Sequence, residues 1–311
     1  VIGHSFNPTE TPTILGFIKS FVYCFHMPAF FFISGFLEGE KRRSISEKKQ
    51  AIVKKAKRLM VPYFFLTVVT AVLKLLFGAF ARNPLSYSTL AVDVLIGRNN
   101  PNGGLWFLYA LFIISIFEIL LDTINRTTLT GTMFVLYMLN TVVFKQSGYA
   151  VGFFLSYAWI YFMGGAVRKH LYEKIKNSEL LMSVKGIVII AVVSVGYMML
   201  AFVRIYKSQS WILATAVTVI GVFLLFVIAV QIEHYHCGEK LWMLLGDYGM
   251  DIYMIGYYVQ QAIFVVCGKI LGFDYLVYAW MMLIFGLIAP IFLSKYVVRK
   301  NHMLSTLILG R

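Results

Sequence analysis

Charged residues are scarce in this sequence. Asp, Glu, Lys and Arg together make up 14% of its 311 residues, whereas soluble domains carry about 25%. Hydrophobic residues account for 59% of the chain, and the mean hydropathy is +0.77. The composition therefore excludes an ordinary soluble domain and is typical of an integral membrane protein.

Cysteine is also rare, and the common cofactor motifs are missing. The three cysteines, Cys24, Cys237 and Cys267, form no Cys-x-x-Cys pair, so they indicate neither a disulfide framework nor a metal site. The run from His234 to Cys237 has no matching ligand cluster elsewhere, and we expect no metal ion there. No Gly-x-Gly-x-x-Gly, Walker A or serine-elbow sequence occurs. The sequence therefore gives no indication of dinucleotide binding, of a P-loop or of a serine hydrolase.

Acidic residues are too few to balance the basic ones, and the net charge is +14. This excess does not indicate nucleic acid as a partner, because the sequence has no zinc-finger spacing and no basic helix with interleaved aromatic residues. Most Lys and Arg residues occur instead in short runs between apolar segments, above all in 38–58 and 168–185. Such runs are typical of the cytoplasmic loops of membrane proteins.

Apolar segments dominate the rest of the chain and predict an all-α, multi-pass transmembrane helix bundle of about ten helices. The first helix is expected to be truncated, because the sequence begins inside an apolar run. The basic runs predict that both chain ends are cytoplasmic. With no charge-rich linker, we expect a single integral-membrane domain over 1–311. The expected helices are 1–4, 14–37, 59–81, 105–121, 129–144, 151–167, 186–203, 211–230, 244–267 and 275–294.

The second expected helix contains an unusual segment, residues 25–36, which reads Phe-His-Met-Pro-Ala-Phe-Phe-Phe-Ile-Ser-Gly-Phe. His26 is an ionisable group at membrane depth, and such groups usually face a bundle interior or a water-filled cavity. Pro28 has no backbone N–H, and its ring clashes with the carbonyl of Cys24. We therefore predict a kink or break beside His26, where the segment lines a chamber in the bundle.

Few other ionisable residues fall inside the apolar segments. His4 ends the first of them and is a candidate general base; the alternative is an interfacial histidine at a helix end. His26 is either functional or a packing residue bonded between helices. Lys19 and Glu118 are expected to extend to a membrane interface. Asp251 is expected to begin a helix and favour its N-terminus.

Several motifs, taken in chain order, resemble the acyltransferase-3 family of integral membrane O-acyltransferases. The His-Met-Pro sequence is most similar to the fucose 4-O-acetylase-like branch of that family. A late block, 245–256, departs from the family pattern, because Gly249 stands at its serine and Gly256 at its histidine. That departure leaves the substrate type open. The residues that carry the resemblance are Val1-Ile2-Gly3-His4, the segment 25–36, Lys57-Arg58-Leu59 with Pro62-Tyr63, and Leu105-Trp106-Phe107-Leu108.

The resemblance implies transfer of an acyl group, usually acetyl, from cytoplasmic acyl-CoA to a hydroxyl of a cell-envelope carbohydrate. The protein would lie in the bacterial cytoplasmic membrane, with acetyl-CoA as co-substrate and no bound cofactor. His4 matches the family's essential histidine and would act as general base, with His26 as an orienting or oxyanion-side partner. Arg58, beside Lys57, matches the basic position that would meet the CoA phosphates.

Three further residues are candidates for binding the acceptor: Trp106, Ser34 and Tyr23. A transporter or flippase of a small solute or lipid-linked sugar is the alternative function, because a kinked helix with a buried histidine suits both classes. A chain that begins inside a helix also fits an inactive fragment. The residues predict neither the acceptor sugar nor an oligomeric state.

Overall fold

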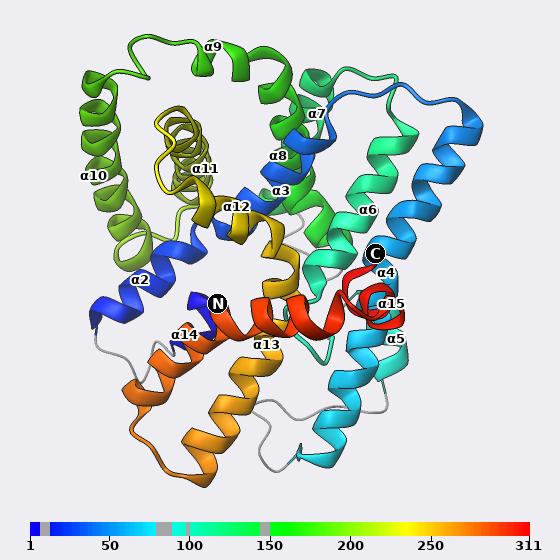
Figure 1. Cartoon of the computed structure of the whole chain (residues 1–311). Helices are drawn as coiled ribbons and strands as arrows, with labels where there is room; N and C mark the ends of the chain where they lie inside the picture. The colour runs from blue at the N-terminus through cyan, green and yellow to red at the C-terminus, as the bar shows by residue number, and fades with distance from the viewer. Residues whose placement is uncertain (7–12, 79–88, 98–99, 144–149) are drawn as a thin grey trace.

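The computed structural model describes residues 1–6, 13–78, 89–97, 100–143 and 150–311, apart from the side chains of Ile2, His4, Thr13 and Ala150. No β-strand occurs within these residues (Figure 1). The helices are α1 (Ile2–Ser5), α2 (Thr13–Tyr23), α3 (His26–Glu38), α4 (Ile45–Leu76), α5 (Leu90–Leu95), α6 (Trp106–Leu120), α7 (Arg126–Val142), α8 (Ala150–His170), α9 (Tyr172–Lys176), α10 (Val184–Tyr206), α11 (Trp211–His234), α12 (Glu239–Asp247), α13 (Gly249–Ile263), α14 (Tyr275–Leu293) and α15 (His302–Leu304). The π-helical segments η2 (Phe264–Ile270), η3 (Ser294–Val298) and η4 (Ser305–Leu309) continue α13, α14 and α15.

Six helical stretches of the described chain are long and apolar enough to cross a membrane. Helix α6 is apolar but shorter. The prediction of an all-α, multi-pass membrane bundle is therefore confirmed. The six stretches are Ile14–Glu38, Ile45–Leu76, Val184–Tyr206, Trp211–His234, Gly249–Ile270 and Tyr275–Val298.

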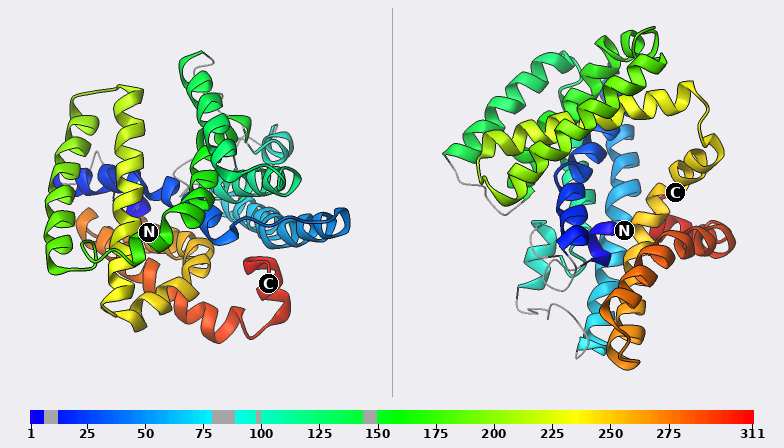
Figure 2. Two further views of the ribbon diagram at one scale, coloured as in Figure 1. Left: turned by 90° about the horizontal axis from the view of Figure 1, so that it is seen from above. Right: turned by 90° about the vertical axis from the view of Figure 1, so that its left-hand side faces the viewer.

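The bundle is built from pairs of helices that pack side by side. Helix α8 packs against both α3 and α7, α4 packs against α6 and η4, and α13 packs against α14. In the right-hand view of Figure 2, α7 to α11 (green to yellow) gather on one side and α13 and α14 (orange) on the other, with α2 and α3 (blue) between them. The beginning of α3 thus lies near the centre of the molecule.

Glycines allow α3 and α8 to approach closely. A Cβ atom on Gly35 would lie 1.8 Å from the carbonyl oxygen of Tyr161, and one on Gly164 would lie 2.0 Å from that of Phe32. Small residues permit such contacts between the backbones of membrane helices. Phe31 and Phe32 of the same turns are fully buried against α8 and its neighbours. The aromatic segment 25–36 therefore presents one face to the helix core, while Phe30 and Ile33 are each 50% exposed.

The basic segment 38–58 differs from the expected loop, because α4 begins at Ile45 and makes most of the segment helical. The N-cap Ser44 and Glu47 form a capping box, in which each side chain accepts the other's backbone N–H. The residues that follow, largely Lys, Glu, Gln and Ala, favour helix. The basic residues therefore lie on a rigid helix that continues directly into the apolar span.

Candidate active site

The predicted break beside His26 is confirmed, since α2 ends at Tyr23 and α3 begins at His26. The carbonyls that the break frees have new partners. Val22 O accepts from the backbone N–H of Phe25 at 3.3 Å, and Cys24 O accepts from Thr218 Oγ1 of α11 at 3.0 Å. In an intact helix the Cys24 carbonyl would accept from the backbone N–H at position 28, which proline lacks. Thr218 of the neighbouring helix α11 supplies the hydrogen bond instead, because backbone polar groups at membrane depth need a partner within the protein.

The His26 side chain is held by this broken turn. Its Nδ1 lies 3.0 Å from Val22 O. A carbonyl oxygen only accepts hydrogen bonds, so Nδ1 carries the hydrogen and the neutral ring keeps its lone pair on Nε2. His26 is therefore arranged to accept a proton or hydrogen bond at Nε2. In this tautomer Nε2 cannot donate to an oxyanion.

Tyr23 connects the broken turn to α1. Its ring packs edge-on against His26 with a centroid distance of 4.6 Å, and its hydroxyl donates to Gly3 O at 3.2 Å. A Cβ on Gly3 would lie 2.4 Å from the Tyr23 ring, so only glycine fits there without movement. The backbone beside His4 and the ring of His26 thus contact the same tyrosine.

Helix α1 is also held by α13 and α14. Gln260 Nε2 donates to Val1 O at 3.1 Å and to Ser5 Oγ at 2.8 Å, and Tyr275 OH donates to Ser5 O at 3.4 Å. Ser5 is 1% exposed. His4 precedes this buried serine; its side chain lies outside the described part of the chain. The short helix that carries His4 is therefore anchored inside the bundle.

The other two candidate acceptor-binding residues lie elsewhere: Trp106 packs against the buried helix core, and Ser34 is a partly exposed residue of α3. Trp106 stacks on Phe153 of α8 with a centroid distance of 4.6 Å and an interplanar angle of 25°. Ser34 Oγ donates to Phe30 O of its own helix at 2.8 Å. Of the three predicted residues, Tyr23 is the one with a contact to His26. The described contacts of Trp106 are those of a packing residue, whereas the Ser34 hydroxyl bonds the backbone of its own helix.

A basic pocket of about 790 Å³ lies along the first turns of α4, next to the C-terminal end of the chain. The predicted residues Lys57 and Arg58 both line it. We call it the α4 pocket; its lining residues are Lys49, Gln50, Val53, Lys54, Lys57, Arg58, Gly310 and Arg311. The α4 residues of this lining are spaced so that they share one face of the helix. The same spacing in the sequence could have identified Lys49 and Lys54 as further residues of the pocket.

Sequence analysis missed the contribution of the chain's last residues to this pocket. Gly310 has a φ of +66°, which favours glycine. A Cβ at Gly310 would lie 2.3 Å from Arg58 O. This close contact between η4 and α4 brings Arg311 into the pocket. Arg311 lies 253 residues after Arg58 in the sequence, so no local sequence pattern could have predicted that the two residues meet.

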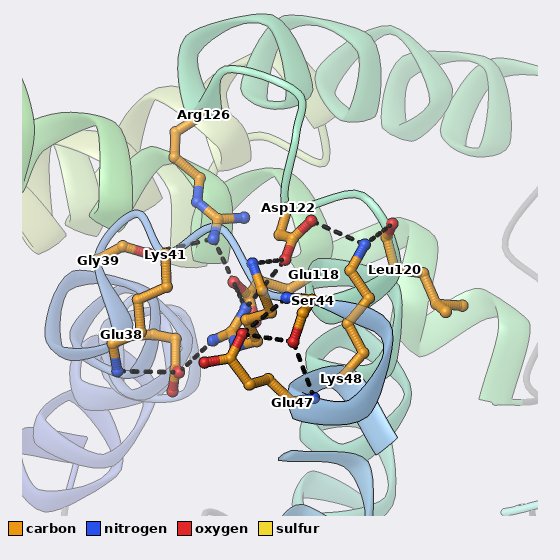
Figure 3. Close-up of polar contacts among 11 residues, drawn as sticks. Glu38, Gly39, Lys41, Ser44, Glu47, Lys48, Glu118, Leu120, Asp122 and Arg126 are labelled. Carbon is orange, nitrogen blue, oxygen red and sulfur yellow. Dashed lines mark hydrogen bonds and ion pairs between the residues drawn. The ribbon is translucent and has the colours of Figure 1, made fainter. Parts of the chain in front are cut away.

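A cluster of buried charges lies at the α3–α4 connection (Figure 3). Glu118 of α6 is 0% exposed; it pairs with Arg126 of α7 and, at 3.3 Å, with Arg43. The expectation that Glu118 extends to a membrane interface is therefore wrong. Two arginines neutralise the carboxylate inside the protein, which is the condition for burying it.

Asp122 and Glu38 extend this cluster to α4. Asp122 accepts from the backbone N–H of Arg43 at 2.8 Å and pairs with Lys48 at 2.8 Å. Glu38 pairs with Lys55 at 2.7 Å. Lys55 lies on α4 three residues before Arg58, a residue of the α4 pocket. Burial alone would raise the pKa of Asp122, but the Lys48 ammonium and the Arg43 N–H hold that pKa below its ordinary value. The cluster fixes α4 relative to α3 and α6.

Asp251 lies in the first turn of α13, as expected, and has a second role there. It is fully buried, accepts from Ser294 Oγ, and pairs with Arg299 at 2.8 Å. The Arg299 guanidinium also lies 3.9 Å from the ring centroid of Tyr248. These contacts join α13 to the end of η3 and so hold the chain that leads to the α4 pocket.

The family model of the acyltransferase-3 domain, described as "Acyltransferase domain", matches residues 1–299. No curated protein and no solved structure matches the chain significantly. The match covers nearly the whole sequence, including His4, the broken helix and most of the α4 pocket. It favours acyl transfer over the alternative of a transporter or flippase. The chain belongs to the acyltransferase-3 family and is a membrane acyltransferase.

Proposed function

We propose that this acyltransferase moves an acetyl group from cytoplasmic acetyl-CoA to a hydroxyl of a cell-envelope carbohydrate. The protein would act in the bacterial cytoplasmic membrane with both ends inside, as the basic runs suggest. The His-Met-Pro sequence supports the fucose 4-O-acetylase-like branch. The observation that carries the proposal is the α4 pocket, where two predicted cations belong to a larger basic surface.

The α4 pocket suits the phosphates of CoA. Its lining combines five cationic side chains, and among these described residues there is no acidic side chain. Arginine and lysine bind phosphate oxygens through charge-assisted hydrogen bonds. The ion pair of Lys55 with Glu38 holds the adjacent turn of α4, so Lys57 and Arg58 are presented by a fixed helix. A pocket on the cytoplasmic side would meet acyl-CoA where the cell makes it.

The proposed general base is His4. A sugar hydroxyl is a weak nucleophile at neutral pH, and a positioned base contributes about 10² to 10⁴ in rate. The imidazole takes the hydroxyl proton as the oxygen attacks the thioester carbonyl. When the intermediate collapses, the new C–O bond remains, the C–S bond breaks, and the sulfur of CoA leaves with the proton from the imidazolium.

His26 and the start of α3 would assist this step. Since Nδ1 of His26 bonds Val22 O, Nε2 can accept a hydrogen bond and orient the acceptor hydroxyl. The developing oxyanion needs donors in a dry site. The backbone N–H groups of His26 and Met27 start α3 and have no partner within their own helix, so they are our candidates for this role.

The experiment compares two substitutions in the full-length protein, purified in lipid nanodiscs and supplied with acetyl-CoA. We expect His4→Gln to lower kcat by about 10² to 10⁴ with little change in KM. We expect Arg58→Gln to raise KM for acetyl-CoA about tenfold, the loss of one charge-assisted hydrogen bond. CoA release is followed by chromatography, and transfer by labelled acetyl in envelope glycans.

Matched controls remove the same side-chain types from exposed positions. His236→Gln changes a histidine whose side chain is 77% exposed, and Lys174→Gln changes an exposed lysine of α9. Neither is expected to alter kcat or KM. Unchanged turnover in folded His4→Gln protein would reject His4 as the base. Equal effects of Arg58→Gln and Lys174→Gln on KM would reject the α4 pocket as the donor site.

A further inference from the structure

Two buried polar side chains of α13 bond the segments that carry the two halves of the proposed site, the α4 pocket and His4. Asp251 is 0% exposed and Gln260 is 2% exposed. They lie nine residues apart on one α-helix, which separates them by about 14 Å along its axis. The mechanism proposed above uses neither side chain.

The Asp251 end of α13 supports the wall of the α4 pocket that contains Arg311. Asp251 accepts from Nε and Nη2 of Arg299 at 2.9 and 2.8 Å, and such a bidentate pair fixes the orientation of the guanidinium. Twelve residues after Arg299 the chain contributes Arg311 to the pocket. The segment η4 between them packs against both α13 and α4. The position of Arg311 therefore depends on the Asp251 pair.

Apolar contacts strengthen this connection. Ile308 of η4 packs against a buried cluster that includes Met254 of α13 and Leu59 of α4. Met254 lies three residues after Asp251, and Leu59 directly follows Arg58. The turn of α13 that carries Asp251 and the turn of α4 that carries the pocket cation thus hold η4 together. A change in the Asp251 pair would reach the pocket through these contacts.

The Gln260 end of α13 holds the helix that carries His4. Gln260 Nε2 donates to Val1 O at 3.1 Å and to Ser5 Oγ at 2.8 Å, so one amide bonds α1 on both sides of His4 in the sequence. Helix α1 has four residues, and a helix this short needs tertiary contacts to form. A misplacement of about 1 Å in a reacting group can lower a rate about 10²-fold.

We propose that α13 positions both halves of the active site, with Asp251 and Gln260 as its two positioning residues. Asp251 sets the place of Arg311 in the α4 pocket, and Gln260 sets the place of α1 and thereby of His4. This inference rests on the proposed function for the roles of the pocket and of His4. Because one continuous helix carries both residues, it would hold the pocket wall and α1 at a constant separation.

Kinetics of the full-length protein in nanodiscs separate the two roles. Asp251→Asn should raise KM for acetyl-CoA about tenfold at unchanged kcat, because Arg311 loses its place and the donor loses one charge-assisted hydrogen bond. Gln260→Met keeps the size of the side chain but removes its N–H donors, and it should lower kcat about 10²-fold at unchanged KM. General destabilisation does not produce this split. Loss of both parameters in both variants, or of neither, would overturn the proposal.

A second variant breaks the Asp251 pair from its partly exposed side, in case Asp251→Asn does not fold. Arg299 has 25% of its side chain exposed, and Arg299→Gln should raise KM as Asp251→Asn does, whereas Arg299→Lys should give an intermediate KM. In a chain with Arg311→Gln, Arg299→Gln should raise KM no further, because the cation that the pair positions is already absent. Additive increases in KM would show that the pair does not act through Arg311.

Adjacent residues supply matched controls. Lys300→Gln removes the same charge as Arg299→Gln from an exposed position, and Gln261→Met repeats the Gln260 change at the next, partly exposed residue of α13. Neither control should alter kcat or KM. If Gln260→Met does not fold, Ser5→Ala removes one of the two acceptors on α1 and should lower kcat in the same direction. Equal effects of a variant and its adjacent control would overturn the positioning role.

Hydrogen exchange tests the two connections without turnover. In Arg299→Gln protein, the backbone amides of residues 305–311 should exchange about tenfold faster, because a local opening becomes easier when hydrogen bonds are lost. Those of residues 1–6 should not change, and Gln260→Met should give the reverse pattern. Unchanged exchange in both variants, or equal acceleration of both segments, would overturn the inference. Exchange that changes as expected in a chain that releases no CoA contradicts only the proposed function.

Discussion

Arg126 of α7 and Glu118 of α6 form an ion pair inside the protein, with 3% and 0% of their side chains exposed. Removing one partner of a buried pair leaves an uncompensated charge and costs about 3–5 kcal/mol. Glu118→Gln leaves both Arg126 and Arg43 without this carboxylate. We therefore expect a strongly lowered unfolding temperature, measured on detergent-solubilised protein by fluorescence-detected size exclusion.

The control for this prediction is Glu179→Gln, which makes the same chemical change at an exposed position. It should leave the unfolding temperature within about 1 °C, because exposed charges contribute little. The double substitution Glu118→Gln with Arg126→Gln removes both charges and should cost less than the sum of the single changes. Strict additivity, or a loss for Glu118→Gln no larger than for Glu179→Gln, would contradict a buried pair.

Asp122 predicts how stability depends on pH. Its pKa is lower in the folded protein than in the unfolded chain, because Lys48 and the Arg43 N–H outweigh the effect of burial. A lowered carboxyl pKa contributes stability that is fully present above the unfolded value of about 3.8 and is lost as pH falls through the folded value. When the pH is lowered from 5 to 3, the unfolding temperature should decrease less in the Asp122→Asn variant than in the unmodified protein. Parallel losses would contradict this role for Asp122.

Gly35 predicts a steric limit on the contact between α3 and α8. A methyl group at Gly35 would meet the backbone oxygen of Tyr161 at 1.8 Å, and backbone cannot move aside as a side chain can. Gly35→Ala should therefore separate the helices and lower the yield of folded protein and its unfolding temperature. Gly196→Ala is the matched control, since Gly196 is also inside a helix and a Cβ there meets nothing within 4 Å. Ala at Gly196 should be neutral or stabilise the protein by up to about 1 kcal/mol.

The membrane bundle and the broken helix could be predicted from sequence because their causes are local. Runs of about 20 apolar residues predict spans, and the effect of Pro28 extends only to the preceding turn. The charge pattern predicts a loop over the basic segment 38–58, although the capping box of Ser44 and Glu47, which marks the start of α4, is also a local feature. These features needed no knowledge of how distant segments meet.

The charge cluster could not be predicted in the same way. Arg43 binds Asp122 and Glu118, which lie 79 and 75 residues further along the chain, and these partners meet only after α3, α4 and α6 have packed. A single Glu in an apolar run fits an interfacial side chain as well as a buried pair. The contact of Tyr23 with Gly3 and His26 also depends on tertiary structure, because the direction of that ring follows from the break.

Thr218 predicts a link between the broken helix and catalysis. Its hydroxyl is the partner of the Cys24 carbonyl that Pro28 frees. Thr218→Val keeps the shape but leaves this oxygen unpaired, which costs about 1–3 kcal/mol. Because Cys24 lies two residues before His26, we expect the broken turn to shift and kcat to fall while KM for the proposed donor, acetyl-CoA, stays constant. Thr141→Val is the control, since Thr141 Oγ1 donates to Tyr137 O within an intact helix. If both valine variants lower kcat equally, the loss is general, and the Thr218 contact does not position His26.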